Sequence, residues 1–215
     1  MVRRAGGAGV AADTGSGANT GAAPGARAAE LVEGFEPENE LEAAVAADPD
    51  LLEGLAWGKP RKSHPEGRIC NHVADLLRAI DARDESPARR AQLRFVALVH
   101  DSFKGDVRSF LPKSGENHHA MRARRFAERY TGDEVLLATI ELHDRPYAIW
   151  KKMRRKGRLD EDALDEVFER VPDHDLFLSF IEVDGSSEAK DQDPIRWLRG
   201  EMEGRGLVPA RHGGT

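Results

Sequence analysis

The spacing of the apolar residues from residue 67 onward limits the fold more than any other feature of the sequence. Apolar residues recur three or four positions apart, as Ile69, Val73 and Leu76 do, and this spacing places them on one face of a helix. No segment alternates apolar and polar residues with the two-residue period of a half-buried strand. The sequence therefore predicts an all-α fold, a helical bundle with its apolar faces turned inward.

Capping residues divide this part of the chain into successive helices. Ser86 and Pro87 are typical of an N-cap followed by proline at the first helical position, and Gly185 is typical of a helix end. Two short helices are expected first, one at residues 40–47 and one capped by residues 48–50. The longer helices are expected at residues 67–83, 86–102, 114 or 117 to 130, 131 or 133 to 144 with a continuation from 146, from 160 onward, 172 or 173 to 185, and from 193 onward.

The first residues differ in composition from the rest. Residues 1–28 consist mainly of Gly, Ala, Ser, Thr and Asn, with no large hydrophobic residue after Val10. Such a segment cannot bury enough apolar surface to offset the entropy lost on ordering it. We therefore expect a disordered tail over residues 1–37, one folded domain over residues 38–205, and a flexible tail over residues 206–215.

Histidine or aspartate interrupts the apolar face of five of the expected helices. In the helix of residues 86–102, Leu93 and Ala97 share a face with His100, and Asp101 follows directly. The corresponding residues of the other four helices are His72, His119, His143 and Asp184.

A lone histidine on an apolar face is usually an ordinary core residue, and a lone aspartate near a helix end is usually a cap. Burying several such groups without partners costs several kcal/mol each, so their recurrence indicates that they share a ligand. A metal cluster satisfies them together, and imidazole nitrogen with carboxylate oxygen suits Fe, Mn, Co, Zn or Mg.

Helical phase also separates the neighbours His118 and His119. His119 lies on the same face as Ala123 and Phe126, whereas His118 shares its face with Arg122 and other arginines. We therefore expect His119 to be the metal ligand. His118 and Arg122 are expected near the mouth of the pocket, where they would contact a substrate.

The ordered set of these residues resembles the HD-domain superfamily of metal-dependent phosphohydrolases. The segment from Arg94 to Lys104 is similar to the family's apolar run followed by HDxxK, although Phe103 stands where glycine is common. The sequence His64-Pro-Glu66-Gly, followed by His72, and the ending Asp184-Gly are similar to the HD portion of bacterial tRNA nucleotidyltransferases. The resemblance covers roughly residues 58–205 and implies only the accessory hydrolase module.

The resemblance implies two divalent metal ions and a role for each motif residue. Asp101 would bridge the two ions and orient the attacking hydroxide, which makes it a catalytic residue. Lys104 would neutralise charge on the phosphate, or else be an ordinary surface lysine. His64 and Glu66 would contact substrate near the electropositive start of the helix that carries His72. The first ion would be held by His72, His100, Asp101 and Asp184, and the second by Asp101, His119 and His143.

The function implied by the resemblance is hydrolysis of a phosphoester, in a nucleotide or another small phosphorylated substrate, by a metal-activated hydroxide. Two alternatives stay open. Some HD proteins with six ligands use a di-iron centre to oxidise substrates with dioxygen, and a degenerate HD domain would bind a ligand without turning it over. The sequence indicates neither the exact substrate nor the metal.

Composition excludes several classes of protein. The formal net charge of −6 argues against bulk binding to DNA or RNA. The single cysteine, Cys70, excludes an intramolecular disulfide and zinc sites built from CxxC pairs. No run approaches the ~20 apolar residues that a membrane span requires, so we expect a cytoplasmic protein without membrane association. The sequence does not indicate an oligomeric state.

Overall fold

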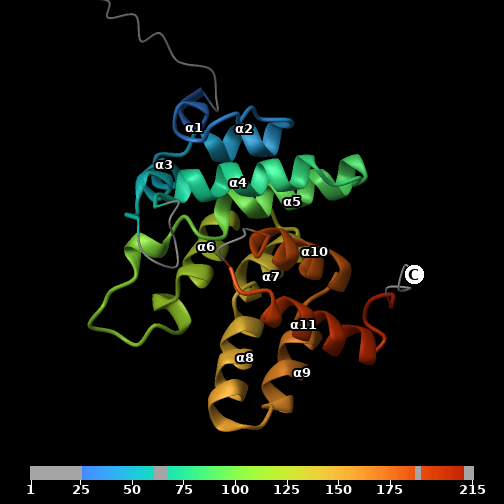
Figure 1. The fold of residues 1–215 in the computed structure, drawn as a ribbon. Coiled ribbons are helices and arrows are strands. Elements are labelled where there is room, and N and C mark those ends of the chain that lie inside the picture. The colour runs from blue at the N-terminus through green and yellow to red at the C-terminus, as the bar shows by residue number, and fades with distance from the viewer. Residues whose placement is uncertain (1–25, 61–66, 187–189, 211–215) are drawn as a thin grey trace, which may run out of the picture.

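The computed structural model describes residues 26–60, 67–186 and 190–210, and the regular structure within these ranges is helical (Figure 1). No strand occurs in them, and the contact closest to a sheet is an isolated bridge between Gly58 and Arg68. The all-α prediction is therefore confirmed. The helices are α1 (Ala26–Leu31), α2 (Glu40–Ala46), α3 (Pro49–Ala56), α4 (Ile69–Asp81), α5 (Pro87–Val99), α6 (His119–Ala127), α7 (Glu134–Leu142), α8 (Arg145–Lys156), α9 (Glu161–Arg170), α10 (His174–Asp184) and α11 (Asp193–Gly204), with short 3-10 turns η1 (Lys104–Asp106) and η2 (Gly115–Asn117).

Local sequence explains where most of these helices begin. Ser86 accepts a hydrogen bond from the backbone N–H of Arg89, and Pro87 takes the first position of α5. Asp133 and Asp173 cap α7 and α10 in the same manner. Gly157 ends α8 with a φ of 71°, a left-handed conformation that glycine adopts without strain.

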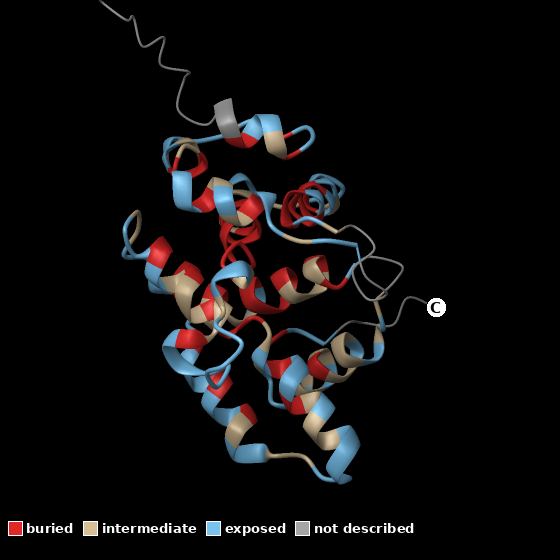
Figure 2. Cartoon of the chain, turned by 90° about the vertical axis from the view of Figure 1, so that its left-hand side faces the viewer, coloured by how far each residue is buried: buried red, intermediate tan, exposed pale blue. Residues whose placement is uncertain are grey.

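Two hydrophobic cores share the helices α7 and α10. In Figure 1 these two helices lie between α4 and α5 on one side and α8, α9 and α11 on the other, and Figure 2 colours the buried residues red. The larger core lies among α1 to α6, one face of α7 and one face of α10. The smaller core contains the opposite faces of α7 and α10 together with α8, α9 and α11. As a result, the ends of α5, α7 and α10 meet where the two cores join. None of the helices in the described ranges is long and apolar enough to cross a membrane.

Ordered structure extends into both segments that were expected to be tails, at residues 26–37 and at residues 206–210. Ala28 of α1 is buried, and so are Val32 and Phe35 in the segment that follows this helix. Within residues 26–37 these three side chains join the larger hydrophobic core, which differs from the disorder expected for residues 1–37. At the other end Val208 is buried and the N–H of Leu207 donates to the Met202 carbonyl, so the flexible tail does not begin at residue 206. Residues 1–25 and 211–215 lie outside the described ranges.

Among the helix boundaries that differ from expectation, the end of α5 determines where Asp101 lies and the start of α6 determines where His119 lies. Helix α5 ends at Val99 rather than Ser102, so Asp101 lies in the turn that follows it. Helix α6 begins at His119 rather than at residue 114 or 117. The side chain of Asn117 instead bonds to the backbone of Arg108 and Pro112, which closes the connecting loop in front of α6.

A buried ion pair joins α2 to α5. Arg94 Nη2 lies 3.0 Å from Glu42 Oε2 and donates a second hydrogen bond of 2.8 Å to the Glu36 carbonyl. Both charged side chains are almost completely buried. The N-terminal helices are therefore joined to the rest of the chain by charge as well as by apolar contact.

Candidate metal centre

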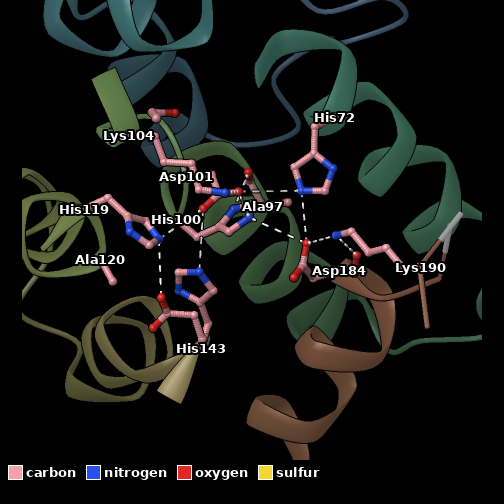
Figure 3. Close-up of polar contacts among 12 residues, drawn as sticks. His72, Ala97, His100, Asp101, Lys104, His119, Ala120, His143, Asp184 and Lys190 are labelled. Carbon is pink, nitrogen blue, oxygen red and sulfur yellow. Dashed lines mark hydrogen bonds and ion pairs between the residues drawn. The ribbon is translucent and has the colours of Figure 1, made fainter. Parts of the chain in front are cut away.

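The six residues expected to bind metal come together in the structure, although they belong to five different helices or helix ends. His72 lies on α4, His100 and Asp101 follow α5, His119 begins α6, His143 follows α7, and Asp184 ends α10. Figure 3 shows their side chains pointing toward one another. His72, His100, Asp101 and His143 are buried, and His119 and Asp184 are partly exposed.

One half of the cluster contains His72, His100 and Asp101, whose nearest ligand atoms lie within 4.8 Å of one another. Asp101 Oδ2 lies 3.4 Å from His100 Nε2 and 3.9 Å from His72 Nε2. Asp184 Oδ1 lies beside them, 3.0 Å from His72 Nε2 and 3.9 Å from His100 Nε2. This half matches the four residues expected to hold the first ion.

The other half contains Asp101, His119 and His143, again with ligand atoms within 4.8 Å. Asp101 Oδ1 lies 3.4 Å from His119 Nε2 and 3.6 Å from His143 Nε2. Asp101 therefore directs one carboxylate oxygen toward each half of the cluster. This is the arrangement that a carboxylate bridging two ions requires.

Backbone carbonyls orient two of the imidazoles. His100 Nδ1 lies 3.1 Å from the Ala97 carbonyl, and His143 Nδ1 lies 2.8 Å from the Ile140 carbonyl. A carbonyl only accepts hydrogen bonds, so in each ring Nδ1 carries a proton and Nε2 faces the cluster. Histidine ligands in metalloproteins are commonly held this way by their second nitrogen.

Three buried atoms of the cluster have no hydrogen-bond partner in the described part of the chain: His100 Nε2, Asp101 Oδ1 and His119 Nε2. Leaving buried polar atoms unsatisfied costs free energy, so such atoms are rare. Two imidazoles and a carboxylate on each side form a donor set that suits divalent Fe, Mn, Co or Zn. The residues present therefore fit divalent metal ions.

Charge interactions keep the carboxylates ionised. Burial raises the pKa of Asp101, but the neighbouring His100 and Lys104 lower it further, and the net pKa lies well below its usual range. The pKa of Asp184 is also held well below its usual range, where Lys190 and His72 outweigh the effect of burial. Both residues can therefore serve as anionic ligands at neutral pH.

The pKa values of the buried imidazoles shift in opposite directions. Burial lowers the pKa of His100. For His143 burial also lowers the pKa, but the carboxylate of Asp101, 3.6 Å from its Nε2, and the nearby Asp144 and Asp184 outweigh burial and raise the pKa to about 9. The ring of Phe180 packs edge-on against both histidines, with centroids 5.0 and 6.2 Å away, and closes the cluster from the side of α10.

Lys104 is part of the cluster rather than an ordinary surface lysine. Its Nζ donates a hydrogen bond to Asp101 Oδ2 from the 3-10 turn that follows the His-Asp pair. Burial lowers the pKa of Lys104, but Asp101 raises it more, so the ammonium group stays charged.

Of the four residues expected to contact substrate, the structure describes His118 and Arg122 but not His64 and Glu66. His118 lies beside the cluster, with Nε2 3.3 Å from Asp144 Oδ2, and its side chain is 27% exposed against 14% for His119. Arg122 is partly exposed, and its buried Nε has no hydrogen-bond partner in the described ranges. His64 and Glu66 lie outside the described residues, so their role stays a prediction.

Two charged residues of the site were not anticipated from the sequence. Lys190 Nζ lies 3.0 Å from Asp184 Oδ1, and Asp144 Oδ2 lies 3.7 Å from His119 Nε2. The sequence does contain a signal for Asp144, because His143-Asp144 is a second His-Asp pair at a helix end. Lys190 has no comparable signal, since it lies in a connection between two helices.

A cavity of about 330 Å³ lies next to the cluster but does not include it. Ser102, Phe103 and Trp57 line it, together with Asp50, Glu53, Gly54, Gly105 and Asp106. None of the six cluster residues contributes to its wall. The wall of this cavity is therefore separate from the side chains expected to bind metal.

Comparison of the chain with protein-family models, with curated proteins and with solved structures found no match. The structural conclusion is a helical bundle with a buried His/Asp cluster that can hold metal ions, compatible with an HD-like fold.

Proposed function

We propose that this protein is an HD-type phosphohydrolase that uses two divalent metal ions to cleave a phosphoester bond in a nucleotide or another small phosphorylated substrate. The observation that carries the proposal is the position of Asp101 between two histidine pairs, with one oxygen directed to each. Divalent ions held there would activate water for in-line attack and offset the charge of the phosphoryl oxygens.

The exposed edge of the cluster supports a phosphorylated substrate. Lys104 is 24% exposed while its ammonium group contacts Asp101, so it lies between the buried ligands and solvent. A phosphate entering from this edge would meet that fixed positive charge next to the ligands. Arg122 adds a cationic side chain on α6, the helix that begins at His119, and its buried Nε has no hydrogen-bond partner in the described ranges. Donors placed in advance where charge develops are an effective source of transition-state stabilisation.

The proposal is tested by metal analysis followed by a substrate screen. Protein purified without added metal would be analysed for Fe, Mn, Co and Zn, and then assayed on nucleotides and model phosphoesters. We expect metal in the wild type together with hydrolysis of at least one phosphoester, and loss of both in His100→Ala and Asp101→Ala. Full metal content and full activity in these two variants would contradict the proposal.

The same four histidines would also suit a di-iron oxygenase, which is the second candidate. Iron is soft enough to accept a histidine-rich set and hard enough to accept bridging carboxylate. Iron as the bound metal, with oxygen consumption and no phosphate release, would favour the oxygenase. Phosphate release under anaerobic conditions would favour the hydrolase.

A further inference from the structure

The pair His143-Asp144 repeats the local structure of His100-Asp101. Each histidine is the residue directly after a helix, α7 in one case and α5 in the other. Their backbone angles are nearly equal, with φ and ψ of −53° and −34° for His143 and −50° and −39° for His100. In both rings Nδ1 faces a carbonyl three residues earlier. Asp101 and Asp144, which follow these histidines, therefore occupy equivalent positions after a helix end.

The carboxylate of Asp144 does not cap the helix that follows it. Asp144 is the N-cap residue of α8, but its side chain accepts no capping hydrogen bond, in contrast to Asp133 on α7 and Asp173 on α10. Its Oδ1 is buried and has no hydrogen-bond partner in the described ranges. Its Oδ2 lies 3.7 Å from Nε2 of His119. An ordinary capping role therefore does not account for this side chain.

His118 supplies the contact that orients Asp144. His118 Nδ1 accepts a hydrogen bond from the backbone N–H of Ala120, so this nitrogen carries a lone pair. In a neutral imidazole the proton then lies on Nε2, which faces Asp144 Oδ2 at 3.3 Å. His118 thus turns a protonated Nε2 toward Asp144, the opposite of His100 and His143, whose ring protons lie on Nδ1.

His118, His119 and Asp144 could be taken for a third metal site, because their ligand atoms lie within 4.8 Å of one another. Two facts argue against a separate ion. His118 Nε2 carries a proton, as shown above, and His119 Nε2 has a single lone pair that can bind only one ion. The carboxylate of Asp144 and the imidazole of His119 therefore belong to the same metal position.

We propose that Asp144 is a ligand of the second metal ion, together with Asp101, His119 and His143, and that His118 positions it. This inference rests on the metal centre of the proposed function. Each ion would then have two imidazoles, one oxygen of Asp101 and a carboxylate of its own. The first position already shows this pattern, with Asp184 as its own carboxylate and Lys190 as the cation that holds it at 3.0 Å.

The test is a Co²⁺ titration of the metal-stripped full chain, followed by calorimetry and by visible absorption. The variant Asp144→Asn removes the charge at nearly constant volume. Its matched control is Asp133→Asn, which takes the same charge from the N-terminus of α7, where asparagine still caps. His118→Ala tests the positioning residue, and circular dichroism checks that each variant is folded.

We expect two Co²⁺ ions in the wild type and in Asp133→Asn. In Asp144→Asn the first ion should bind as before, while the affinity for the second falls by about tenfold or more, and His118→Ala should weaken the second ion by a smaller factor. Unchanged binding of both ions by Asp144→Asn would overturn the inference and leave the proposed function standing. Three ions in the wild type, with one lost in both His118→Ala and Asp144→Asn, would overturn it in favour of a separate site. A wild type that binds no Co²⁺, Mn²⁺, Fe²⁺ or Zn²⁺ would overturn the inference and the proposed function together.

Discussion

Asp101 Oδ1 lies 3.4 Å from Nε2 of His119, although Asp101 lies in the turn after α5 and His119 begins α6, with a long loop between them. The other oxygen, Oδ2, faces His100 at 3.4 Å. In each contact, a metal ion bound between the carboxylate oxygen and the imidazole nitrogen would lie closer to both atoms than they lie to each other. Asp101 is the residue common to the two halves of the cluster. Its replacement should therefore affect both metal positions, whereas replacement of another ligand should affect one.

Replacing Asp101 with asparagine should remove both metal ions. An amide offers one neutral oxygen and no second acceptor, so it cannot serve two positions at once. Asp184→Asn should weaken the first position only, because Asp184 contacts His72 and His100 and not the second pair. Elemental analysis of the three purified proteins measures this difference. Two retained ions in Asp101→Asn would contradict the bridging role.

The metal-free chain should lose stability as the pH rises from about 6.5 to 9. The pKa of His143 is raised to about 9 by Asp101, Asp144 and Asp184, against an unfolded value of 6.5. A raised pKa stabilises the folded state fully below the unfolded value, and this stability disappears as pH passes the folded value. The shift corresponds to roughly 3 kcal/mol.

Urea unfolding of the EDTA-treated chain at pH 6.5 and at pH 9.5 measures this loss. In His143→Gln the free energy of unfolding should change much less between the two values, because the titrating group is absent. An equal change in both proteins would show that another group is responsible.

Lys104→Met should lower phosphoester hydrolysis by at least about tenfold while leaving metal content unchanged. The ammonium group lies on Asp101 at the exposed edge, where it would offset phosphate charge, and it donates no lone pair to a metal. Lys113→Met is the control, because Lys113 is an exposed lysine of the following loop. Steady-state kinetics with parallel metal analysis distinguishes the two effects, and a metal loss equal to the activity loss would argue against a role in catalysis.

The sequence predicted the parts of this site that depend on helical phase. His72, His100, His119 and His143 continue apolar faces, so the period of 3.6 residues places them in the interior together. Asp144 was missed because a residue at a helix end has no fixed phase, and its direction depends on the turn into α8.

The same limit explains the other differences. Helix α1 was not predicted because its buried residue is the small Ala28, and the Gly/Ala-rich composition of this region was interpreted as a disordered tail. The contact of Lys104 with Asp101 depends on a 3-10 turn, which helical spacing does not describe. Lys190 lies between α10 and α11, outside any helix, so helical spacing does not indicate which way its side chain points.

Gly54→Ala should destabilise the fold and disturb the metal centre. A Cβ at this position of α3 would lie 1.9 Å from the Ser102 carbonyl oxygen, and backbone cannot move aside as a flexible side chain can. We expect a loss of about 3 kcal/mol or more, since overpacking of this kind is costly. Because Ser102 adjoins Asp101, metal affinity should fall as well.

Gly200→Ala is the matched control for that substitution. Gly200 is exposed within α11, with no atom within 4 Å of an added Cβ, and alanine favours a helix over glycine by about 1 kcal/mol. Its midpoint of thermal unfolding should rise slightly while that of Gly54→Ala falls. Equal midpoints for the two variants would show that α3 does not pack against the His-Asp turn as described.

Arg94→Leu should cost more stability than removing both members of the Arg94–Glu42 pair. The single substitution leaves the Glu42 carboxylate fully buried without its cation, and breaking a buried pair in this way costs about 3–5 kcal/mol. The double variant Glu42→Leu/Arg94→Leu leaves no buried charge, so part of that loss should be recovered. The free energies of unfolding in urea give the comparison. If the double variant were less stable than Arg94→Leu, the cost would arise from lost packing between α2 and α5 rather than from an uncompensated charge.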